Sequence, residues 1–330
     1  MASAIRVNQL YNRILGRFPR EISLAFAYGS GAFKQLGNDN KDNMLDFIFV
    51  VDNPEEWHRK NIQDNRKHYS SLAALGHHRI AAIQDRLGAG VYFNTLVECE
   101  SRLIKYGVVK TDTLVQELIN WNNLYLSGRL HKPVHVIKRM QNSALYNAIR
   151  RNQQSAVYTS LLLLPEQFSE EELFITIAGL SYSGDFRMVV GENKNKVANI
   201  VKPNLHTFRK YYHDMMDNTE NTHWNKQSGT IEQDCNPAAM FSHMCALPKN
   251  LQRQICRLVG SKTEDHLDVM RRLARDKQCK EYIHKGVQRI VATSSLSQSI
   301  KGIFTAGFSK TMTYSKQKLM KQWQGGRKKR

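Results

Sequence analysis

The first third of the chain alternates between short apolar runs and longer stretches in which apolar residues recur every third or fourth position. An alternating or unbroken apolar run of about four to eight residues is typical of a strand, and the longer spacing is typical of an amphipathic helix. We therefore predict strands at 22–28, 45–51, 90–97, 102–109 and 133–138, and helices at 54–64, 67–86 and 111–126. Strands and helices alternating in this way predict an α/β domain, a mixed sheet with flanking helices, over residues 1–138.

The residues before the first strand predict a helix. Its apolar positions follow helical spacing and are Val7, Leu10, Tyr11, Ile14, Leu15 and Phe18. The segment carries four arginines, and Glu21 is the first acidic residue of the chain. An acid-free, arginine-rich amphipathic start is typical of mitochondrial targeting segments, and it is equally what the first helix of the domain would look like. Because the first strand begins at Ile22, we expect one segment to serve as both.

The strongest chemical signal lies at the end of the first strand. Tyr28-Gly29-Ser30-Gly31 follows that strand, and Asp46 stands inside the apolar run of the second. A Gly-Ser-Gly turn exposes backbone N–H groups that can bind phosphate oxygens. An unpaired carboxylate among apolar neighbours is costly, but at a cleft edge it can coordinate a hard cation that also binds the phosphates. The order of these features predicts a nucleotidyltransferase site; an ordinary turn and a loop-capping aspartate are the alternative.

The remainder of the chain predicts mostly helix. Residues 139–215 form a helical domain in which Ser169 and Glu172 have the spacing of a capping box. Residues 216–238 are rich in Asn, Thr, Asp and Gln, which favours a surface loop or linker. A helical block at 239–295 follows, and then a basic tail at 296–330.

Length, cysteine content and net charge limit the kinds of protein that this chain can be and the partners that it can bind. The 330 residues suffice for two domains, and no apolar run approaches the length of about 18 residues that spans a bilayer. The five cysteines are widely spaced without a CxxC pair, which disfavours a disulfide framework or structural zinc and favours a reducing compartment. The formal net charge of +19 requires an anionic partner such as nucleic acid, an acidic membrane or a phosphorylated substrate.

The distribution of this charge favours a membrane surface. No acidic residue follows Glu281, and the rest of the chain adds eleven lysines and arginines. In the tail, lysines alternate with apolar residues, namely Ile300, Phe304, Phe308, Met312, Leu319, Met320 and Trp323. A basic amphipathic helix of this kind lies in the headgroup plane of an anionic bilayer. A solvated basic tail is the alternative.

Several segments taken together resemble one family, the mitochondrial CDP-diacylglycerol synthases, also described as translocator assembly and maintenance proteins. The segments that carry the resemblance are Tyr28-Gly29-Ser30-Gly31, Leu45-Asp46-Phe47-Ile48, Trp57-His58 to Asn61, His68-Tyr69-Ser70, Gly88 to Asn94, Ile104 to Val108, Leu126 to Val134, Gly179 to Met188 and Lys301 to Gly307. The resemblance covers about residues 20 to 210 and resumes near 295.

This resemblance implies a reaction in which CTP and phosphatidic acid give CDP-diacylglycerol and pyrophosphate with Mg²⁺. It implies a peripheral protein on the matrix side of the mitochondrial inner membrane, serving phosphatidylglycerol and cardiolipin synthesis. It also implies a nucleotidyltransferase domain followed by a winged-helix-like helical domain and a membrane-contacting C-terminal region.

Carried onto this sequence, the resemblance and the local patterns suggest individual roles. Gly29, Ser30 and Gly31 would bind the β- and γ-phosphates, and Asp46 would hold Mg²⁺. The second carboxylate of the general nucleotidyltransferase signature is replaced by Ile48, so another ligand is needed unless one carboxylate suffices. The remaining candidates are Asp185 as that ligand or a turn cap, Lys105 as a phosphate contact or a snorkelling lysine, Arg129 and Lys132 as anchors for CTP or the lipid phosphate, and Asn94 as a reader of a base edge.

Two other functions remain open from the sequence. A template-independent RNA nucleotidyltransferase would share the glycine turn, the carboxylate and the basic surface, but it normally carries the second carboxylate. A non-catalytic factor for protein import would explain the tail but not the glycine turn or Asp46. The lipid reading is therefore preferred, with no nucleic acid partner expected.

Overall fold

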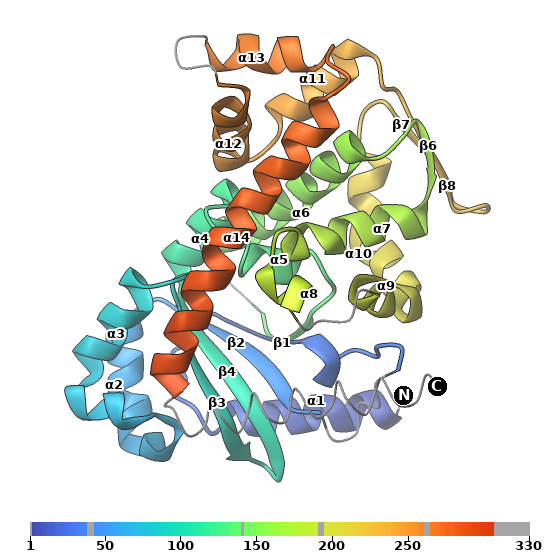
Figure 1. Ribbon diagram of the computed structural model, residues 1–330. Coiled ribbons are helices and arrows are strands. Elements are labelled where there is room, and N and C mark those ends of the chain that lie inside the picture. The colour runs from blue at the N-terminus through green and yellow to red at the C-terminus, as the bar shows by residue number, and fades with distance from the viewer. Residues whose placement is uncertain (1, 38–42, 140–141, 191–194, 261–264, 307–330) are drawn as a thin grey trace. The chain divides into compact units, whose positions relative to one another are not determined.

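The computed structural model describes residues 2–37, 43–139, 142–190, 195–260 and 265–306 (Figure 1). The chain divides into two compact units. Unit 1 comprises residues 1–114, 134–145 and 296–330, and unit 2 comprises 115–133 and 146–295. The predicted boundary at residue 138 therefore differs from the observed division, because residues 115–133 cluster with the second unit.

Unit 1 is built on a five-stranded mixed sheet with the order β3-β4-β2-β1-β5. The strands are β1 (Leu24–Tyr28), β2 (Leu45–Val51), β3 (Val91–Cys99), β4 (Arg102–Lys110) and β5 (His135–Lys138). The β2–β4 pair is parallel, and the other pairs are antiparallel. The predicted mixed sheet is confirmed, with the strands within two residues of their expected bounds.

Three helices pack on one face of this sheet, namely α1 (Ala2–Leu15), α2 (Pro54–Asn65) and α3 (His77–Arg86) (Figure 1). Tyr11 and Phe47 meet edge to face with ring centroids 5.5 Å apart, and Phe49 packs on Trp57 at 6.2 Å. All four side chains are buried, and burying each contributes about 1.5–3 kcal/mol. Side chains alternate along β2, so Ile48, which lies between Phe47 and Phe49, points to the other face of the sheet. Asp46 points to the same face as Ile48.

Two predicted helices of this region are shorter or broken. The helix expected at 67–86 consists of two 3₁₀ turns, Arg66–His68 and Ser71–Leu75, followed by α3, because Gly76 has a positive φ of 86°. The helix expected at 111–126 ends early, as α4 (Thr111–Asn120), where Trp121 adopts a left-handed φ of 54°.

Unit 2 is mainly helical, with one small antiparallel sheet. Its helices are α5 (Ser127–Leu130), α6 (Ser143–Leu163), α7 (Glu170–Gly179), α8 (Phe186–Val190), α9 (Lys196–Val201), α10 (Leu205–Asp217), α11 (Pro237–Cys245), α12 (Lys249–Val259), α13 (His266–Leu273) and α14 (Cys279–Ala306), the last of which continues into unit 1. Phe174, Phe208 and Tyr212 stack within one large hydrophobic core. The capping box at the start of α7 is confirmed.

The segment predicted as a loop at 216–238 contains a β-hairpin instead. Strands β7 (Thr222–Asn225) and β8 (Thr230–Gln233) pair, and β6 (Gln167–Ser169) adds a third strand in the order β6-β8-β7. The polar composition concealed the strands because Trp224 and Ile231 are their only buried apolar residues, and the third buried side chain, Gln233, is polar. Asn225 caps the turn by accepting hydrogen bonds from the Gln227 and Ser228 amides.

The last turns of α14 correct one part of the tail prediction. Lys301 belongs to the predicted basic tail at 296–330, but it is only 3% exposed and donates hydrogen bonds to the Gln84 and Leu87 carbonyls at the end of α3. Burial lowers the pKa of Lys301 to about 7. By contrast, Ile300 is 48% exposed, and the tail from 307 to 330 lies outside the described residues.

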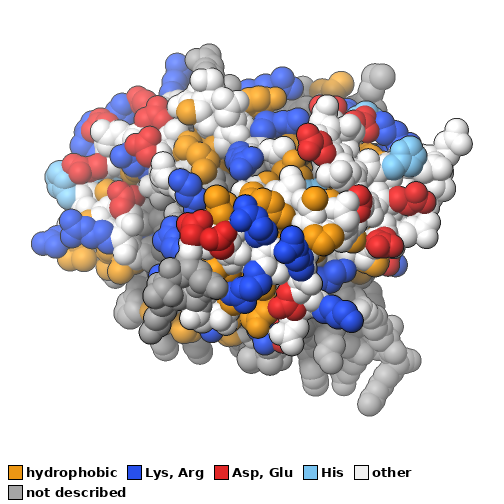
Figure 2. Space-filling model, turned by 90° about the horizontal axis from the view of Figure 1, so that it is seen from above, with side chains coloured by type: hydrophobic (Ala, Val, Ile, Leu, Met, Phe, Trp, Pro, Cys, Tyr) orange, Lys and Arg blue, Asp and Glu red, His pale blue; other side chains and the backbone are white. Residues whose placement is uncertain are grey.

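Positive charge is not confined to the tail. Figure 2 shows lysine and arginine side chains interspersed with hydrophobic ones and with fewer acidic ones on the face drawn. Among the described helices, none combines the length and the apolar character needed to cross a bilayer.

Candidate active site

The glycine turn and the carboxylate singled out by the sequence lie together in unit 1. Gly29–Gly31 forms a 3₁₀ turn directly after β1, closed by hydrogen bonds from the Ala32 and Phe33 amides to the Gly29 carbonyl. Tyr28 pairs with Asp46 across β1 and β2. A Cβ added to Gly29 would lie 3.4 Å from Asp46 Oδ2, so the carboxylate is directly beside the turn. The arrangement places a carboxylate next to the backbone of the glycine turn.

Both outer glycines are required by this geometry. Gly29 has a φ of +76°, a backbone conformation that a side chain disfavours. A Cβ on Gly31 would lie 2.6 Å from the Met44 carbonyl oxygen, closer than any real contact. The turn can therefore approach β2 only if these positions lack side chains.

Asn43, two positions before β2, supports the turn from outside. Asn43 is 5% exposed and donates from Nδ2 to the Ser30 carbonyl at 3.4 Å. Its own carbonyl accepts a hydrogen bond from Arg102 Nη2 at 3.0 Å. Sequence reasoning missed both residues because neither belongs to a phosphate-binding pattern.

Lys105 lies on the same face of the sheet as Asp46. The two residues are partners in the parallel β2–β4 register, so their side chains project from neighbouring strands toward the same side. Lys105 Nζ lies 4.5 Å from the ring centroid of Phe93. The register thus provides one carboxylate and one ammonium group at adjacent positions near the glycine turn.

The donor set around Asp46 fits a magnesium ion that is completed by substrate. Ile48 occupies the position of the missing second carboxylate and is completely buried, so it offers no ligand. Mg²⁺ in phosphate-transferring sites is bound by one or two carboxylates, substrate phosphates and water. One carboxylate beside a phosphate-binding turn meets that requirement.

The register contradicts the placement of Asn94 with this group. Asn94 pairs with Tyr106, whose side chain lies on the face covered by α1 and α2. Asn94 is 2% exposed, and its amide influences the buried Tyr69 and Tyr106 hydroxyls, whose pKa values burial raises. Strand alternation therefore turns Asn94 to the side of the sheet opposite Asp46, and its role as a reader of a base edge stays a prediction.

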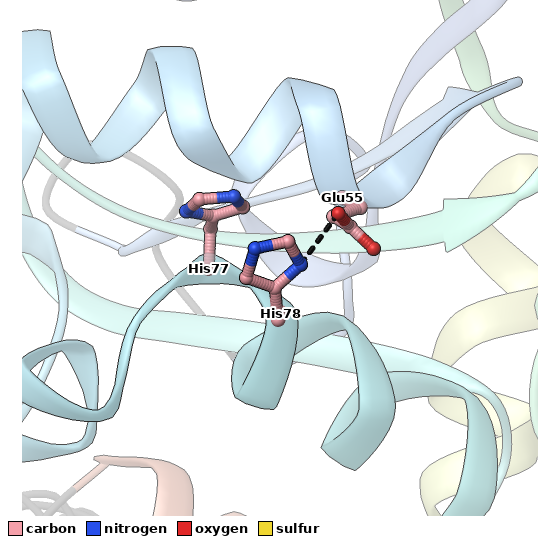
Figure 3. Close-up of side chains that lie close together, drawn as sticks. All are labelled: Glu55, His77 and His78. Atoms are coloured by element: carbon pink, nitrogen blue, oxygen red, sulfur yellow. Dashed lines mark ion pairs between the residues drawn. The ribbon is translucent and has the colours of Figure 1, made fainter.

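Unit 1 also holds a cluster of side chains of the types that bind metals, and two of them form an exposed ion pair. Within the part of the chain that the structure describes, Glu55, His77 and His78 are the three His, Cys, Asp or Glu residues whose ligand atoms cluster (Figure 3). His78 Nδ1 lies 2.6 Å from Glu55 Oε1, with side chains 70% and 50% exposed. The pair joins the N-terminal turns of α3 and α2, where helix dipoles oppose a bound cation.

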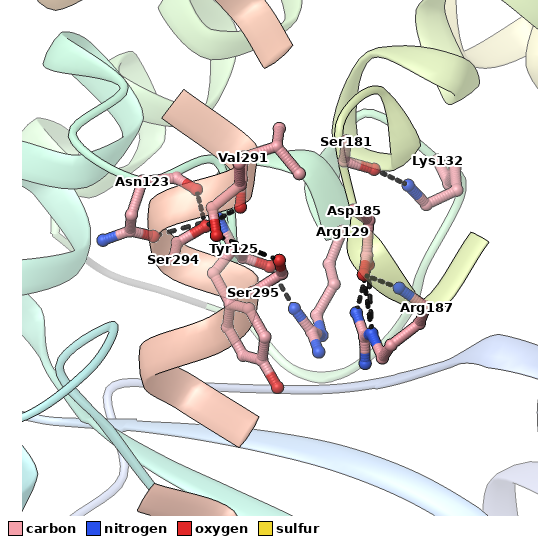
Figure 4. A network of polar contacts seen from close by, with 11 residues as sticks. Asn123, Tyr125, Arg129, Lys132, Ser181, Asp185, Arg187, Val291, Ser294 and Ser295 are labelled. Atoms are coloured by element: carbon pink, nitrogen blue, oxygen red, sulfur yellow. Dashed lines mark hydrogen bonds and ion pairs between the residues drawn. The ribbon is translucent and has the colours of Figure 1, made fainter. Parts of the chain in front are cut away.

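Unit 2 carries a cluster of cations among aromatic rings. Lys132 donates from Nζ to the Gly128 carbonyl and to Ser181 Oγ (Figure 4), and Arg129 donates to the Tyr125 carbonyl while its guanidinium stacks 4.0 Å from the Tyr125 ring. Burial lowers the pKa of Lys132 to about 7, with smaller contributions from the charges of Arg129 and Lys196. An anion bound here would offset the mutual repulsion of these groups.

Tyr182 and Lys196 extend this cluster. Lys132 Nζ and Lys196 Nζ lie 5.1 Å and 5.3 Å from the centroid of the Tyr182 ring. Arg187 is near enough to Arg129 for its pKa to feel that charge. Neither Lys196 nor Arg187 was selected from the sequence, because α9 and α8 bring them in from segments with no phosphate-binding motif.

Asp185 has a local partner in unit 2. Its carboxylate is 3% exposed and accepts hydrogen bonds from the Arg187 amide and from Arg187 Nε at 2.9–3.0 Å (Figure 4). Arg187 Nη2 adds a contact of 2.5 Å. These contacts are those of a residue that caps the start of α8, which was the alternative to a metal ligand; the metal role stays a prediction.

Comparisons with known proteins agree with the family resemblance. The family model described as "Phosphatidate cytidylyltransferase, mitochondrial" matches residues 11–321. Curated proteins of that name are 50% identical in Danio rerio, over 97% of this chain and 96% of the relative, and 49% identical in Bos taurus, over 96% and 95%. The relative from Caenorhabditis elegans is 38% identical over 94% and 98%.

One solved structure, a nucleotidyltransferase-like protein from Exiguobacterium sibiricum, aligns over 89% of this chain and 78% of its own. Its sequence identity is 10% and its TM-score is 0.26, a score below the level at which a shared fold can be inferred.

Proposed function

The chain belongs to the family of mitochondrial phosphatidate cytidylyltransferases, and on this premise we propose that it transfers the cytidylyl group of CTP to phosphatidic acid. The products would be CDP-diacylglycerol and pyrophosphate. The observation that carries the proposal is the Asp46 carboxylate beside the Gly29–Gly31 turn, 3.4 Å from the position of a Gly29 Cβ. A strand-end glycine turn next to a single carboxylate is suited to a metal-bridged triphosphate.

In the proposed reaction the phosphate oxygen of phosphatidic acid attacks the α-phosphorus of CTP. A P–O bond forms there, and the bond from the α-phosphorus to the bridging oxygen breaks, so that pyrophosphate leaves with the electron pair. The backbone N–H groups of the turn and the Ser30 hydroxyl hold the β- and γ-phosphates, and Asp46 would hold Mg²⁺. When bound, the ion supplies neutralisation of the phosphate charge. Such transfer depends on position and charge more than on covalent chemistry.

The cations have separate proposed roles. Lys105 stabilises the charge of the departing pyrophosphate, because it shares the face of Asp46. Arg129 and Lys132 of unit 2 bind the phosphate of phosphatidic acid, since the triphosphate already has a turn in unit 1. A phosphomonoester carries about −1.5 to −2 charges at neutral pH, which suits several clustered cations. Asp185 forms an observed bond with Arg187. We also propose it as the second metal ligand.

The remaining proposals concern architecture and place in the cell. We propose that the helices and the three-stranded sheet of unit 2 form a winged-helix-like domain. The acid-free basic end of the chain favours peripheral contact with an anionic membrane, on the matrix side of the mitochondrial inner membrane. The product would there serve phosphatidylglycerol and cardiolipin synthesis.

The decisive experiment mixes the purified protein with labelled CTP, Mg²⁺ and either phosphatidic-acid liposomes or RNA. We expect label in lipid, and we expect Asp46→Asn to lower the rate by about 100-fold or more because its carboxylate carries the site. Asp112→Asn is the matched control, since Asp112 is 79% exposed on α4 and pairs only locally with Lys110.

The alternatives give different results in the same assay. Label in RNA alone would identify the RNA nucleotidyltransferase, and no incorporation in either substrate would indicate a non-catalytic factor. Equal activity of Asp46→Asn and Asp112→Asn would refute the proposed metal ligand.

A further inference from the structure

A buried carboxylate with no part in the proposed chemistry lies just before the cationic cluster of unit 2. Glu117, in the part of α4 that belongs to unit 2, is 3% exposed. Its Oε2 accepts a hydrogen bond from the Asn123 amide at 3.1 Å, and its Oε1 accepts one from Ser127 Oγ at 2.8 Å. Burial raises the pKa of Glu117 to about 7, and the hydrogen bonds from Ser127 and the backbone of residues 122–124 oppose that rise.

The segment that surrounds this carboxylate has an unusual backbone. Trp121 and Leu124 both have left-handed φ values, 54° and 55°. A non-glycine residue in this conformation is strained and persists only where its surroundings fix it. Glu117 is one of those surroundings, because its carboxylate collects donors from both ends of the turn formed by residues 121–127.

The same turn delivers the cations. Ser127, held by Glu117, is the first residue of α5, which contains Arg129. Lys132 follows that helix and donates to the carbonyl of its second residue, Gly128. Arg129 and Lys132 follow Ser127 by less than two helical turns, so the position of Ser127 sets the positions of both charged side chains.

Other contacts also hold the 121–127 turn, but they bind different groups from the two that Glu117 binds. Ser294 Oγ donates to the Asn123 carbonyl at 2.6 Å (Figure 4), and Asn152 Nδ2 donates to the Ser127 carbonyl at 3.0 Å. These bonds fix carbonyl groups. The Asn123 amide and the Ser127 hydroxyl, the donors at the two ends, are bound by Glu117.

We propose that Glu117 is a positioning residue that holds the 121–127 turn in the conformation that presents Arg129 and Lys132 to a phosphate ester. The inference rests on the proposed function only for the identity of that ester, phosphatidic acid. Glu117 contacts no substrate and acts through Asn123 and Ser127.

Two variants test this without removing the side chain from the core. Glu117→Gln keeps the shape, and its amide oxygen can still accept from one donor while the charge is lost. Ser127→Ala removes one donor and leaves Glu117 in place. In both we expect the KM for phosphatidic acid to rise about tenfold, with kcat and the KM for CTP within about twofold of wild type. Because both substitutions break the same hydrogen bond between Ser127 and Glu117, the double variant should have a KM for phosphatidic acid no higher than that of Glu117→Gln alone.

A second readout does not depend on catalysis. Competitive labelling of lysines with acetic anhydride, followed by mass spectrometry, reports the titration of Lys132, whose pKa lies at about 7. If the turn loosens, Lys132 gains solvent, and its midpoint should rise by about one pH unit in both variants. Glu172→Gln is the control, because Glu172 also accepts a backbone amide, that of Ser169, at a different helix start.

The outcomes separate the inference from the proposed function. An unchanged KM for phosphatidic acid and an unchanged Lys132 midpoint in folded Glu117→Gln or Ser127→Ala would overturn the inference. A Glu172→Gln variant that behaves like them would reduce Glu117 to general stability and would overturn it too. If the wild-type protein makes no CDP-diacylglycerol, the proposed function fails, and the labelling experiment still decides whether Glu117 positions Lys132.

Discussion

The glycine turn of unit 1 and the cationic cluster of unit 2, the two proposed phosphate sites, are built by different physical means. The first uses backbone N–H groups and a single carboxylate at the ends of two paired strands, so its residues lie close in sequence. The second uses long cationic side chains that lie over aromatic rings: Arg129 lies over Tyr125, and Lys132 and Lys196 lie over Tyr182. The turn in unit 1 is built from backbone and tolerates no added side-chain atoms. The cluster in unit 2 is built from side chains and tolerates changes of shape, but it depends on the protonation of its lysines and on the 121–127 turn that holds them.

The largest effect should come from adding one methyl group to the unit 1 turn. In Gly31→Ala the new Cβ would stand 2.6 Å from the Met44 carbonyl, so the turn must move away from β2. A displacement near 1 Å at a reacting group costs about 100-fold in rate, and we expect that loss in kcat/KM for CTP. Steady-state kinetics measures it, with Gly302→Ala as the control, since a Cβ there meets no atom within 4 Å. Equal kinetics for the two variants would show that the turn does not hold the triphosphate.

This contrast also explains which parts of the site were predictable. The strand bounds, the glycine turn and Asp46 followed from local patterns, because hydrogen-bonded neighbours in β1 and β2 are also near in sequence. The side of the sheet that Asn94 faces could not be predicted, because a motif gives the identity of a residue but not its face, and the pairing with Tyr106 decides that. The burial of Lys301, part of the predicted membrane-contacting tail, could not be predicted, since nothing local reveals that the carbonyls of Gln84 and Leu87 lie within reach.

The cluster of unit 2 could be predicted only in part. Arg129 and Lys132 stand together in one basic turn, so the sequence pointed to them. Lys196, Arg187 and Tyr182 join them only through the packing of α8 and α9, and Glu117 looked like an ordinary helical acid. Its burial depends on the left-handed turn after α4, which a propensity argument does not predict.

A smaller effect should distinguish the one cation of β4 that shares the face of Asp46. Lys105→Met keeps the apolar stem and the contact with Phe93 while removing the charge. We expect kcat to fall about tenfold, because a charge that stabilises the leaving pyrophosphate acts mainly in the transition state. The comparison is with Lys110→Met at the end of the same strand, where the ammonium pairs with exposed Asp112. If both variants lose the same activity, Lys105 has no special role and unit 1 binds phosphate through its backbone alone.

The smallest effect concerns stability and is specific to the side-chain site. Because the pKa of Lys132 is lowered to about 7 in the folded protein and is near 10.5 when unfolded, the unfolded chain binds more protons between these values. The free energy of unfolding contributed by this group therefore rises as pH increases from 7 to 10.5 and is lowest below 7. Thermal unfolding at pH 6.5 and pH 9 should show Lys132→Met losing more Tm relative to wild type at the higher pH, by a few degrees at most. An equal loss of Tm at pH 6.5 and pH 9 would mean that Lys132 stays charged in the folded protein over this range, through a permanent anionic partner, and the cluster would then be a structural ion pair rather than a phosphate site.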